Sequence, residues 1–172
     1  MPNSASPEFE LVFPSSGERE TSSFGNLLSR FVFPGLLILL HGDLGAGKTV
    51  LVRGITEGLS AGNVRSPSFT LVNEYPAAIP VTHADLYRRP PGGQEDLALE
   101  EALEEGRLVL VEWAENWKHP PIEEAWICRI ELPEPPDSTD RRTIRIFSFG
   151  EKATFSLREA ATSILKKGEE LD

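Results

Sequence analysis

The feature that most constrains this chain is a glycine-rich segment at residues 42–49, whose letters GDLGAGKT fit the phosphate-loop pattern G-x-x-x-x-G-K-[ST]. An apolar run at residues 36–40 precedes it and is typical of a buried strand. Gly42, Gly45 and Gly47 allow backbone N–H groups to surround a phosphate, because side chains at these positions would block the anion. The segment therefore predicts a binding site for a nucleotide triphosphate at the end of a strand.

The last two residues of the segment supply the groups that such a site needs. The ammonium group of Lys48 can reach the β- and γ-phosphates, and the hydroxyl group of Thr49 can coordinate Mg²⁺. Apolar residues then recur every four positions through residues 49–59, as on one face of a helix. A helix that begins here directs its N-terminal dipole at the phosphates. The alternative is a glycine-rich turn that only joins a strand to a helix.

The length of the chain indicates a single domain, and its charge argues against a protein that binds nucleic acid by itself. Its 172 residues suit one domain, which we place at residues 8–172 after a disordered tail at residues 1–7. The 27 acidic and 17 basic residues give a formal net charge of −10, and the basic residues form no long run. Tight independent binding to nucleic acid is not expected, because that affinity comes from Lys and Arg neutralising phosphates. A basic or mixed protein partner is favoured instead.

The same sequence predicts a soluble cytoplasmic protein. Cys128 is its only cysteine, so no internal disulfide can form and a reducing compartment is expected. No apolar stretch approaches the roughly 20 residues of a membrane-spanning helix. Residues 1–7 lack the charged and apolar segments of a signal peptide. We therefore expect no membrane contact.

Hydrophobic periodicity predicts an alternation of strands and helices along the chain. Strands are expected at residues 9–13, 36–40, 69–75, 81–87, 107–111, 125–132 and 142–149. Helices are expected at residues 21–31, 49–59, 94–105 and 156–167. The last two strands suit a hairpin. This order predicts an α/β fold, a three-layer sandwich around a mixed, partly parallel sheet.

Two carboxylates stand at the ends of predicted strands. Asp85 lies near the end of the strand at residues 81–87, and Glu112 directly follows the apolar strand at residues 107–111. Ligands of open α/β sheets bind at the carboxyl ends of the strands, so both side chains are aimed at the position of a Mg²⁺ ion. An Asp at a strand end is also a common turn or cap residue. His83, two residues before Asp85, is interpreted as a structural histidine.

A run of hydroxyl side chains follows the helix after the glycine-rich segment. Residues 66–71 read Ser-Pro-Ser-Phe-Thr-Leu, which places Ser68 and Thr70 near the expected nucleotide. A hydroxyl oxygen there could join the metal only while a γ-phosphate is present, which would make the segment a switch. A Ser-Pro turn that leads into a strand explains the same residues equally well.

Four motifs in this order resemble the bacterial TsaE family, the ATPases needed to make threonylcarbamoyladenosine in transfer RNA. They are GDLGAGKT at residues 42–49, SPSFTLVNEY at residues 66–75, HADLYR at residues 83–88 and VEW at residues 111–113. The resemblance spans about residues 18–117. It implies a P-loop NTPase-like fold and Mg²⁺-dependent hydrolysis of ATP. The partners that it implies are the TsaB and TsaD proteins, and ANN-decoding transfer RNA would reach the chain through their complex.

The resemblance also implies roles for residues of this chain. Thr49 and Glu112 would hold Mg²⁺, with Asp85 as the acidic residue beside them and the third expected metal ligand. Lys48, Asp85 and Glu112 would form the catalytic set, and residues 68–70 the switch. Glu18 and Arg141 would lie near the adenine or the ribose. With Gly42 from the loop pattern, the expected nucleotide-binding residues are Gly42, Leu44, Gly45, Ala46, Gly47, Lys48, Thr49, Glu18 and Arg141.

This chain departs from the family pattern at two positions. Ser68 stands where the family usually has Thr, which keeps the hydroxyl group but loosens the side chain. Ala98 stands where the family often has Gly. Neither change removes an expected catalytic atom.

Two other functions remain open on the sequence alone. A small-molecule kinase would need an acceptor pocket and a basic lid over the phosphates, for which Arg88 and Arg89 are the adjacent basic pair suitably placed. A nucleotide-gated binding module would bind ATP and a partner but hydrolyse little, and would tolerate the loss of Asp85 or Glu112.

Overall fold

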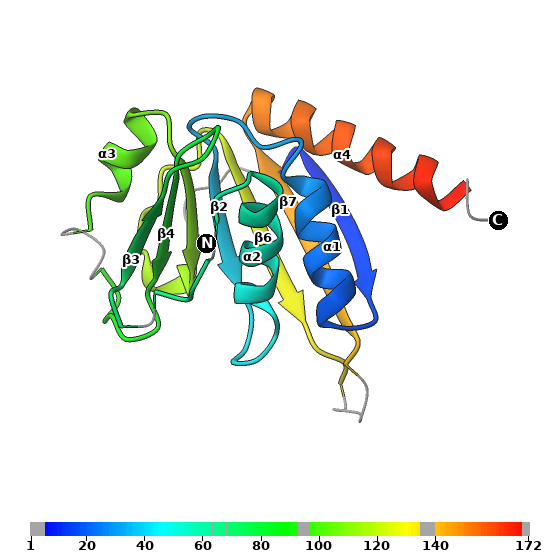
Figure 1. Ribbon diagram of the computed structural model, residues 1–172, viewed down its shortest axis with the longest axis horizontal. Coiled ribbons are helices and arrows are strands. Elements are labelled where there is room, and N and C mark those ends of the chain that lie inside the picture. Colours follow the sequence, from blue (N-terminus) through cyan, green and yellow to red (C-terminus); the bar gives the residue numbers. More distant parts are fainter. Residues whose placement is uncertain (1–5, 63, 68, 93–96, 135–139, 170–172) are drawn as a thin grey trace.

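A seven-stranded sheet organises the chain (Figure 1). The computed structural model describes residues 6–62, 64–67, 69–92, 97–134 and 140–169. The strands are β1 (Phe9–Ser15), β2 (Leu37–His41), β3 (Val72–Tyr75), β4 (Val81–Asp85), β5 (Leu108–Glu112), β6 (Ala125–Glu131) and β7 (Arg142–Phe149). The helices are α1 (Glu18–Leu28), α2 (Lys48–Gly58), α3 (Leu99–Glu104) and α4 (Glu151–Glu169), with a 3₁₀ turn, η1, at Ala114–Asn116. Among the described helices, none combines the length and apolar character needed to span a bilayer.

The sheet is mixed, with a parallel centre and antiparallel edges. Its strand order is β1-β7-β6-β2-β5-β4-β3. Strands β6, β2, β5 and β4 are parallel to one another, whereas β7 joins β6, β1 joins β7 and β3 joins β4 by antiparallel pairing. From β2 the chain first builds β4 and β5 on one side and then places β6 on the other. The carboxyl end of β2 is therefore the point where a sheet of this kind binds its ligands.

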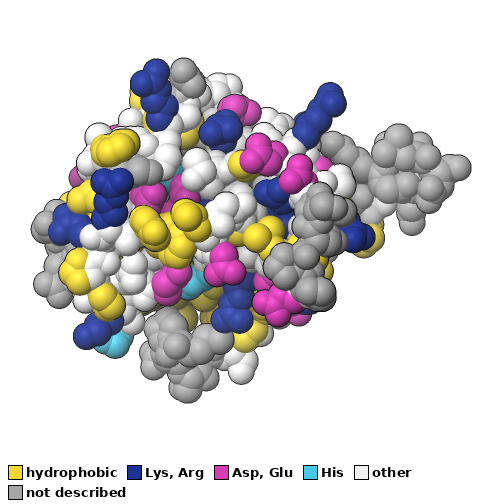
Figure 2. Space-filling model, turned by 90° about the horizontal axis from the view of Figure 1, so that it is seen from below, with side chains coloured by type: hydrophobic (Ala, Val, Ile, Leu, Met, Phe, Trp, Pro, Cys, Tyr) yellow, Lys and Arg dark blue, Asp and Glu magenta, His cyan; other side chains and the backbone are white. Residues whose placement is uncertain are grey.

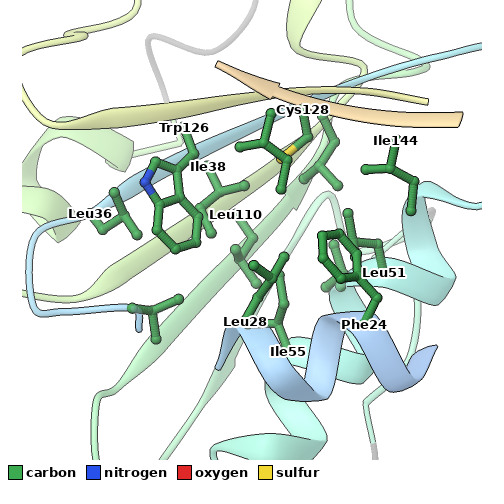
Figure 3. Close-up of a cluster of buried hydrophobic side chains, with 14 of the residues drawn as sticks. Phe24, Leu28, Leu36, Ile38, Leu51, Ile55, Leu110, Trp126, Cys128 and Ile144 are labelled. Atoms are coloured by element: carbon green, nitrogen blue, oxygen red, sulfur yellow. The ribbon is translucent and has the colours of Figure 1, made fainter. Parts of the chain in front are cut away.

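Alternating side chains of the strands form two apolar layers, one on each face of the sheet. Leu36, Ile38 and Leu40 belong to the core that α1, α2 and α4 cover. Figure 3 shows side chains from α1 and α2, including those of Leu28 and Ile55, directed toward this face of the strands. The opposite face packs against α3, η1 and the segment around Trp117. The predicted three-layer α/β arrangement is confirmed.

Helices α1 and α2 contact each other through glycine. A Cβ atom added to Gly25 would lie 2.6 Å from the carbonyl oxygen of Leu51, and one added to Gly54 would overlap the carbonyl oxygen of Ser22. Only glycine at both positions lets the two helix backbones approach this closely. The contact fixes α2, and with it the loop that precedes it, against the sheet.

Several element ends differ from the predicted ones for identifiable reasons. Helix α1 begins at Glu18, earlier than predicted, because the Glu20 carboxylate accepts the N–H and hydroxyl hydrogens of Ser16 at 2.7 Å each. Helix α4 also begins early, at Glu151, because the Glu124 carboxylate accepts N–H groups of its first turn. The Glu124 contacts satisfy N–H groups that the first turn of α4 leaves free, and the Glu20 contacts hold Ser16, which precedes the N-cap residue Gly17 of α1.

Other differences from the predicted elements lie in turns or fall on residues that the structure does not describe. Strand β3 begins at Val72 rather than residue 69, because Leu71 has φ of +68° and interrupts the extended backbone. Ala98, where the family often has Gly, has φ of +53° and precedes α3, so glycine would fit this position better. Of the predicted helix at residues 94–105 only α3 is seen, and residues 93–96 are not described, nor are residues 1–5 of the predicted tail.

Candidate nucleotide-binding site

A cavity of about 350 Å³ lies where β2 passes into α2. The segment at residues 42–49, which joins these elements and includes the first two residues of α2, is called the phosphate loop below, and most of it lines the cavity. Figure 2 views the face on which this loop lies in Figure 1, with hydrophobic side chains near the centre and charged side chains around them. Side chains from several other elements complete the wall, namely Glu18, Ser66, Asp85, Tyr87, Arg88, Glu112 and Trp113.

The phosphate loop has the backbone that its sequence predicts. Gly47 precedes α2 with φ of +111°, a conformation that side chains rarely adopt. A Cβ atom on Gly47 would also lie 2.5 Å from Nη1 of Arg142 on the far side of the loop. The backbone conformation therefore favours glycine at this position, and a side chain here would also have to displace the end of this guanidinium group.

Lys48 is buried at the start of α2, with its ammonium group beside the loop. Its Nζ donates to the carbonyl oxygens of Gly42, at 2.6 Å, and Asp43, at 2.9 Å. It also lies 3.9 Å from the centre of the Trp113 ring, within the range of a cation–π contact. Burial lowers the pKa of Lys48, and the negative charge of Glu112 acts in the opposite direction. The cavity thus presents a partly desolvated amine beside the loop, where charge-assisted hydrogen bonds to phosphate would be strong.

Glu112 connects two other residues of the site. The hydroxyl group of Thr49 donates to its two carboxylate oxygens, at distances of 3.0 and 2.8 Å. Nε2 of His83 lies 2.8 Å from Oε1 of the same carboxylate, and both side chains are buried. A carboxylate and a hydroxyl group side by side at a phosphate loop are the oxygen ligands that Mg²⁺ prefers.

Asp85 lies at the end of β4 and pairs with Glu112 across the parallel strands. The residue is 7 % exposed and lines the cavity, and its Oδ1 accepts the N–H of Tyr87 at 2.9 Å. Burial raises the pKa of Asp85, and the nearby charge of Glu112 raises it further, against the effect of the Tyr87 hydrogen bond. Two carboxylates on adjacent strands thus meet at the cavity, as their positions in the sequence predict.

The donor set fits Mg²⁺ held together with a nucleotide. Within the described ranges, no group of three or more His, Cys, Asp or Glu side chains is placed to hold a metal by itself. Thr49 and Glu112 offer oxygen ligands beside the phosphate loop instead. Mg²⁺ commonly binds one or two protein oxygens and completes its shell with phosphate oxygens and water. The residues therefore suit a nucleotide-bound magnesium ion.

An aromatic pair forms the wall above Lys48. The rings of Tyr87 and Trp113 are 4.7 Å apart, and Tyr87 is half exposed. Trp113 directly follows β5 and has φ of +56°, an unusual backbone for a bulky residue. Such conformations occur most often at functional sites, where the surrounding structure maintains them.

The remaining predicted residues have different positions. Glu18 lines the cavity, whereas Arg141 lines a separate hollow. Ser68, predicted in the switch, is outside the described residues, and the Thr70 hydroxyl donates to Asn73 Oδ1 at 2.6 Å. Ser66 from the same run of hydroxyls does line the cavity. The adenine-side role of Arg141 and the switch role stay predictions.

The structure adds contacts for two residues that the sequence does not reveal. His83, interpreted as a structural histidine, contacts the Glu112 carboxylate. Arg142 donates to Ala46 of the phosphate loop, and is a different residue from Arg141, which is predicted near the adenine or the ribose. A signal for Arg142 exists in the sequence. It alternates with the buried Ile144 and Ile146 along β7, so it shares their core-facing side.

Known proteins match the chain over most of its length. A family model described as "Threonylcarbamoyl adenosine biosynthesis protein TsaE" matches residues 15–144. A tRNA threonylcarbamoyladenosine biosynthesis protein TsaE from Nostoc sp. is 45 % identical over 112 residues, covering 60 % of this chain and 68 % of that protein. The protein of the same description from Bacillus subtilis is 39 % identical over 107 residues, covering 61 % and 67 %.

A solved structure has the same fold. The crystal structure of Bacillus subtilis YdiB superposes with a TM-score of 0.75 and 28 % identity, covering 90 % of this chain and 96 % of that one. The fold is the P-loop NTPase-like fold that the motifs imply.

Proposed function

The chain belongs to the TsaE family, and from this premise we propose that it is a Mg²⁺-dependent ATPase that supports threonylcarbamoyladenosine formation in transfer RNA. The observation that carries the proposal is the contact of the Thr49 hydroxyl with both oxygens of Glu112 at the phosphate loop. A site that only bound phosphate would not need a buried carboxylate beside the Thr49 hydroxyl, whereas hydrolysis needs a carboxylate near the metal.

Each residue has a defined part in this proposal. The N–H groups of the phosphate loop and the ammonium group of Lys48 hold the β- and γ-phosphates. Thr49 and Glu112 hold the metal, and a bound Mg²⁺ neutralises charge on the phosphate oxygens. Asp85 orients the attacking water from the neighbouring strand end, within the same cavity. Water then displaces ADP from the γ-phosphate, and inorganic phosphate is released.

The partners of this activity are proposed from the family. We propose that the chain acts together with TsaB and TsaD. TsaD transfers the threonylcarbamoyl group, and this chain hydrolyses ATP without taking part in the transfer. Transfer RNA reaches the assembly mainly through the other two proteins. The net charge of −10 supports this division, because it disfavours direct contact with an RNA backbone.

Phosphate release by the chain with and without TsaB and TsaD tests the proposal. We expect slow, Mg²⁺-dependent release from the chain alone, a higher rate with both partners, and almost none from Glu112→Ala. A small-molecule kinase would produce ADP and a phosphorylated acceptor without inorganic phosphate. Wild-type release by Glu112→Ala, or turnover that ignores both partners, would reject the proposed function.

A further inference from the structure

Arg142 is a buried guanidinium group on the far side of the phosphate loop from the cavity. It is the first residue of β7 and is 6 % exposed, and it lines the hollow that also contains Arg141 rather than the 350 Å³ cavity. Its Nη1 donates to the carbonyl oxygen of Ala46 at 3.1 Å. Its Nε and Nη2 donate to the carbonyl oxygen of Asp140, at 3.2 and 3.0 Å. One side chain thus connects the strand that begins at residue 142 with the loop at residues 42–49.

The contact with Ala46 fixes the direction of a peptide group. In a trans peptide, the carbonyl of one residue and the N–H of the next point in opposite directions. The Ala46 carbonyl points at Arg142, so the N–H of Gly47 points away from Arg142, and Gly47 lines the cavity. The guanidinium group also fills the space that a Cβ atom on Gly47 would enter. Arg142 therefore keeps a donor of the loop directed at the place of the phosphates.

Among the described residues, no carboxylate forms an ion pair with the guanidinium group of Arg142. Its hydrogen-bond partners there are carbonyl oxygens. A buried cation without an anion is unfavourable, because burial removes its hydration. An anion held in the phosphate loop, on the other side of one peptide group, would offset this cost.

We propose that Arg142 is a positioning residue for the nucleotide, which orients the Ala46–Gly47 peptide toward the phosphates and adds positive charge behind the loop. The inference rests on the proposed nucleotide site but not on its hydrolytic activity or its partners. The N–H group that Arg142 orients faces the phosphates of any nucleotide in the loop. The loss of Arg142 should therefore lower the affinity for ADP and for ATP alike.

Nucleotide affinity of the full chain, measured by calorimetry with Mg²⁺, tests this role in Arg142→Met and Arg142→Lys. We expect Arg142→Met to weaken both ADP and ATP by roughly tenfold to a hundredfold, as for the loss of a charge-assisted contact. Arg142→Lys keeps the charge without the planar fork and should lose less affinity. Hydrogen exchange of residues 42–49 should increase in both variants. Arg145→Met is the matched control, since Arg145 is on the same strand but pairs with Glu10 and Glu131 at the surface.

Two results would overturn the role of Arg142. One is wild-type affinity and wild-type loop exchange in folded Arg142→Met; the other is a lower melting temperature with unchanged affinity, which marks a purely structural residue. If Arg142→Met does not fold, wild-type affinity and loop exchange in Arg142→Lys decide against the inference. A wild-type chain that binds no nucleotide would instead reject the proposed function itself.

Discussion

His83 and Glu112 form a buried pair, with Nε2 of the imidazole 2.8 Å from Oε1 of the carboxylate. Among the described residues, Nδ1 of His83 has no partner. The tautomer that satisfies the pair carries its hydrogen on Nε2 and donates it to Glu112. The imidazole thereby holds the carboxylate in the orientation in which Thr49 also contacts it, much as outer partners orient the ligands of other metal sites.

Replacing His83 should therefore affect the metal-dependent step. His83→Leu leaves the Glu112 carboxylate without its buried donor, so the free energy of unfolding should fall by about 1–3 kcal/mol. The Mg²⁺ concentration needed for half-maximal turnover should rise roughly tenfold or more. His83→Gln, whose amide can donate in place of Nε2, should keep most of the stability and a nearly wild-type Mg²⁺ dependence. Denaturant unfolding and a Mg²⁺ titration measure the two effects, and a wild-type Mg²⁺ dependence in His83→Leu would remove His83 from the site.

Lys48→Ala should weaken nucleotide binding and leave the fold intact, because the ammonium group contacts the loop and the cavity and not the apolar core. A charge-assisted contact of this kind is worth roughly 1.5–3 kcal/mol, or about tenfold to a hundredfold in affinity. Calorimetry with ATP and far-ultraviolet circular dichroism check the two parts. Unchanged ATP affinity in a folded variant would rule out the assigned role.

Asp85→Asn should stop hydrolysis and also stabilise the fold at neutral pH. Burial, with a further contribution from Glu112, raises the folded pKa of Asp85 above its ordinary value of 3.8. The stability that a raised pKa contributes is present below the unfolded pKa and is lost as the pH rises through the folded pKa. At neutral pH the wild type therefore carries an unfavourable charge that Asn lacks, and this advantage of Asn should shrink as the pH falls.

Thermal melts of Asp85→Asn and the wild type, without nucleotide or Mg²⁺, measure this difference at neutral and mildly acidic pH. Phosphate release measures the catalytic part. A variant that is less stable at neutral pH contradicts the stability argument, and one that releases phosphate at the wild-type rate removes Asp85 from the mechanism. Stability gained with activity lost is a common result at active sites.

The order of the elements and the β6–β7 hairpin follow from local pattern, whereas the order of the strands in the sheet and their register do not. Strand β2 is a continuous apolar run because it is buried on both faces, so its position is evident from the sequence. The role of His83 depends on the register that places Asp85 beside Glu112, which no local pattern contains. Alternation with Ile144 and Ile146 indicates the core-facing side of Arg142, but its contact with Ala46 depends on how β7 lies beside the phosphate loop, which the sequence does not contain. Element order can be read locally, whereas the contacts of single polar side chains cannot.

The segment at residues 66–71 should respond to the γ-phosphate. Ser66 lines the cavity. Asn73 connects the two ends of the segment, because it accepts from Thr70 and donates to the carbonyl oxygen of Arg65. Leu71, with φ of +68°, is a strained position at which such a segment can rearrange. We expect slower hydrogen exchange in residues 66–71 with a non-hydrolysable ATP analogue than with ADP. Equal exchange in the two nucleotide states would end the switch hypothesis.

Finally, the isolated chain should bind transfer RNA weakly and should join the TsaB–TsaD pair in an ATP-dependent way. Its net charge of −10 opposes contact with a polyanion, because RNA affinity arises from cations that displace the counterions of phosphates. Titrations at about 50 and 200 mM salt are informative, since a contact with several phosphates loses roughly 10³ or more in affinity over this range. We expect no binding with such a slope from the chain alone, and co-sedimentation with TsaB and TsaD only when ATP is present. Tight, salt-sensitive binding of the isolated chain would show that it contacts transfer RNA directly and would assign it a different place in the assembly.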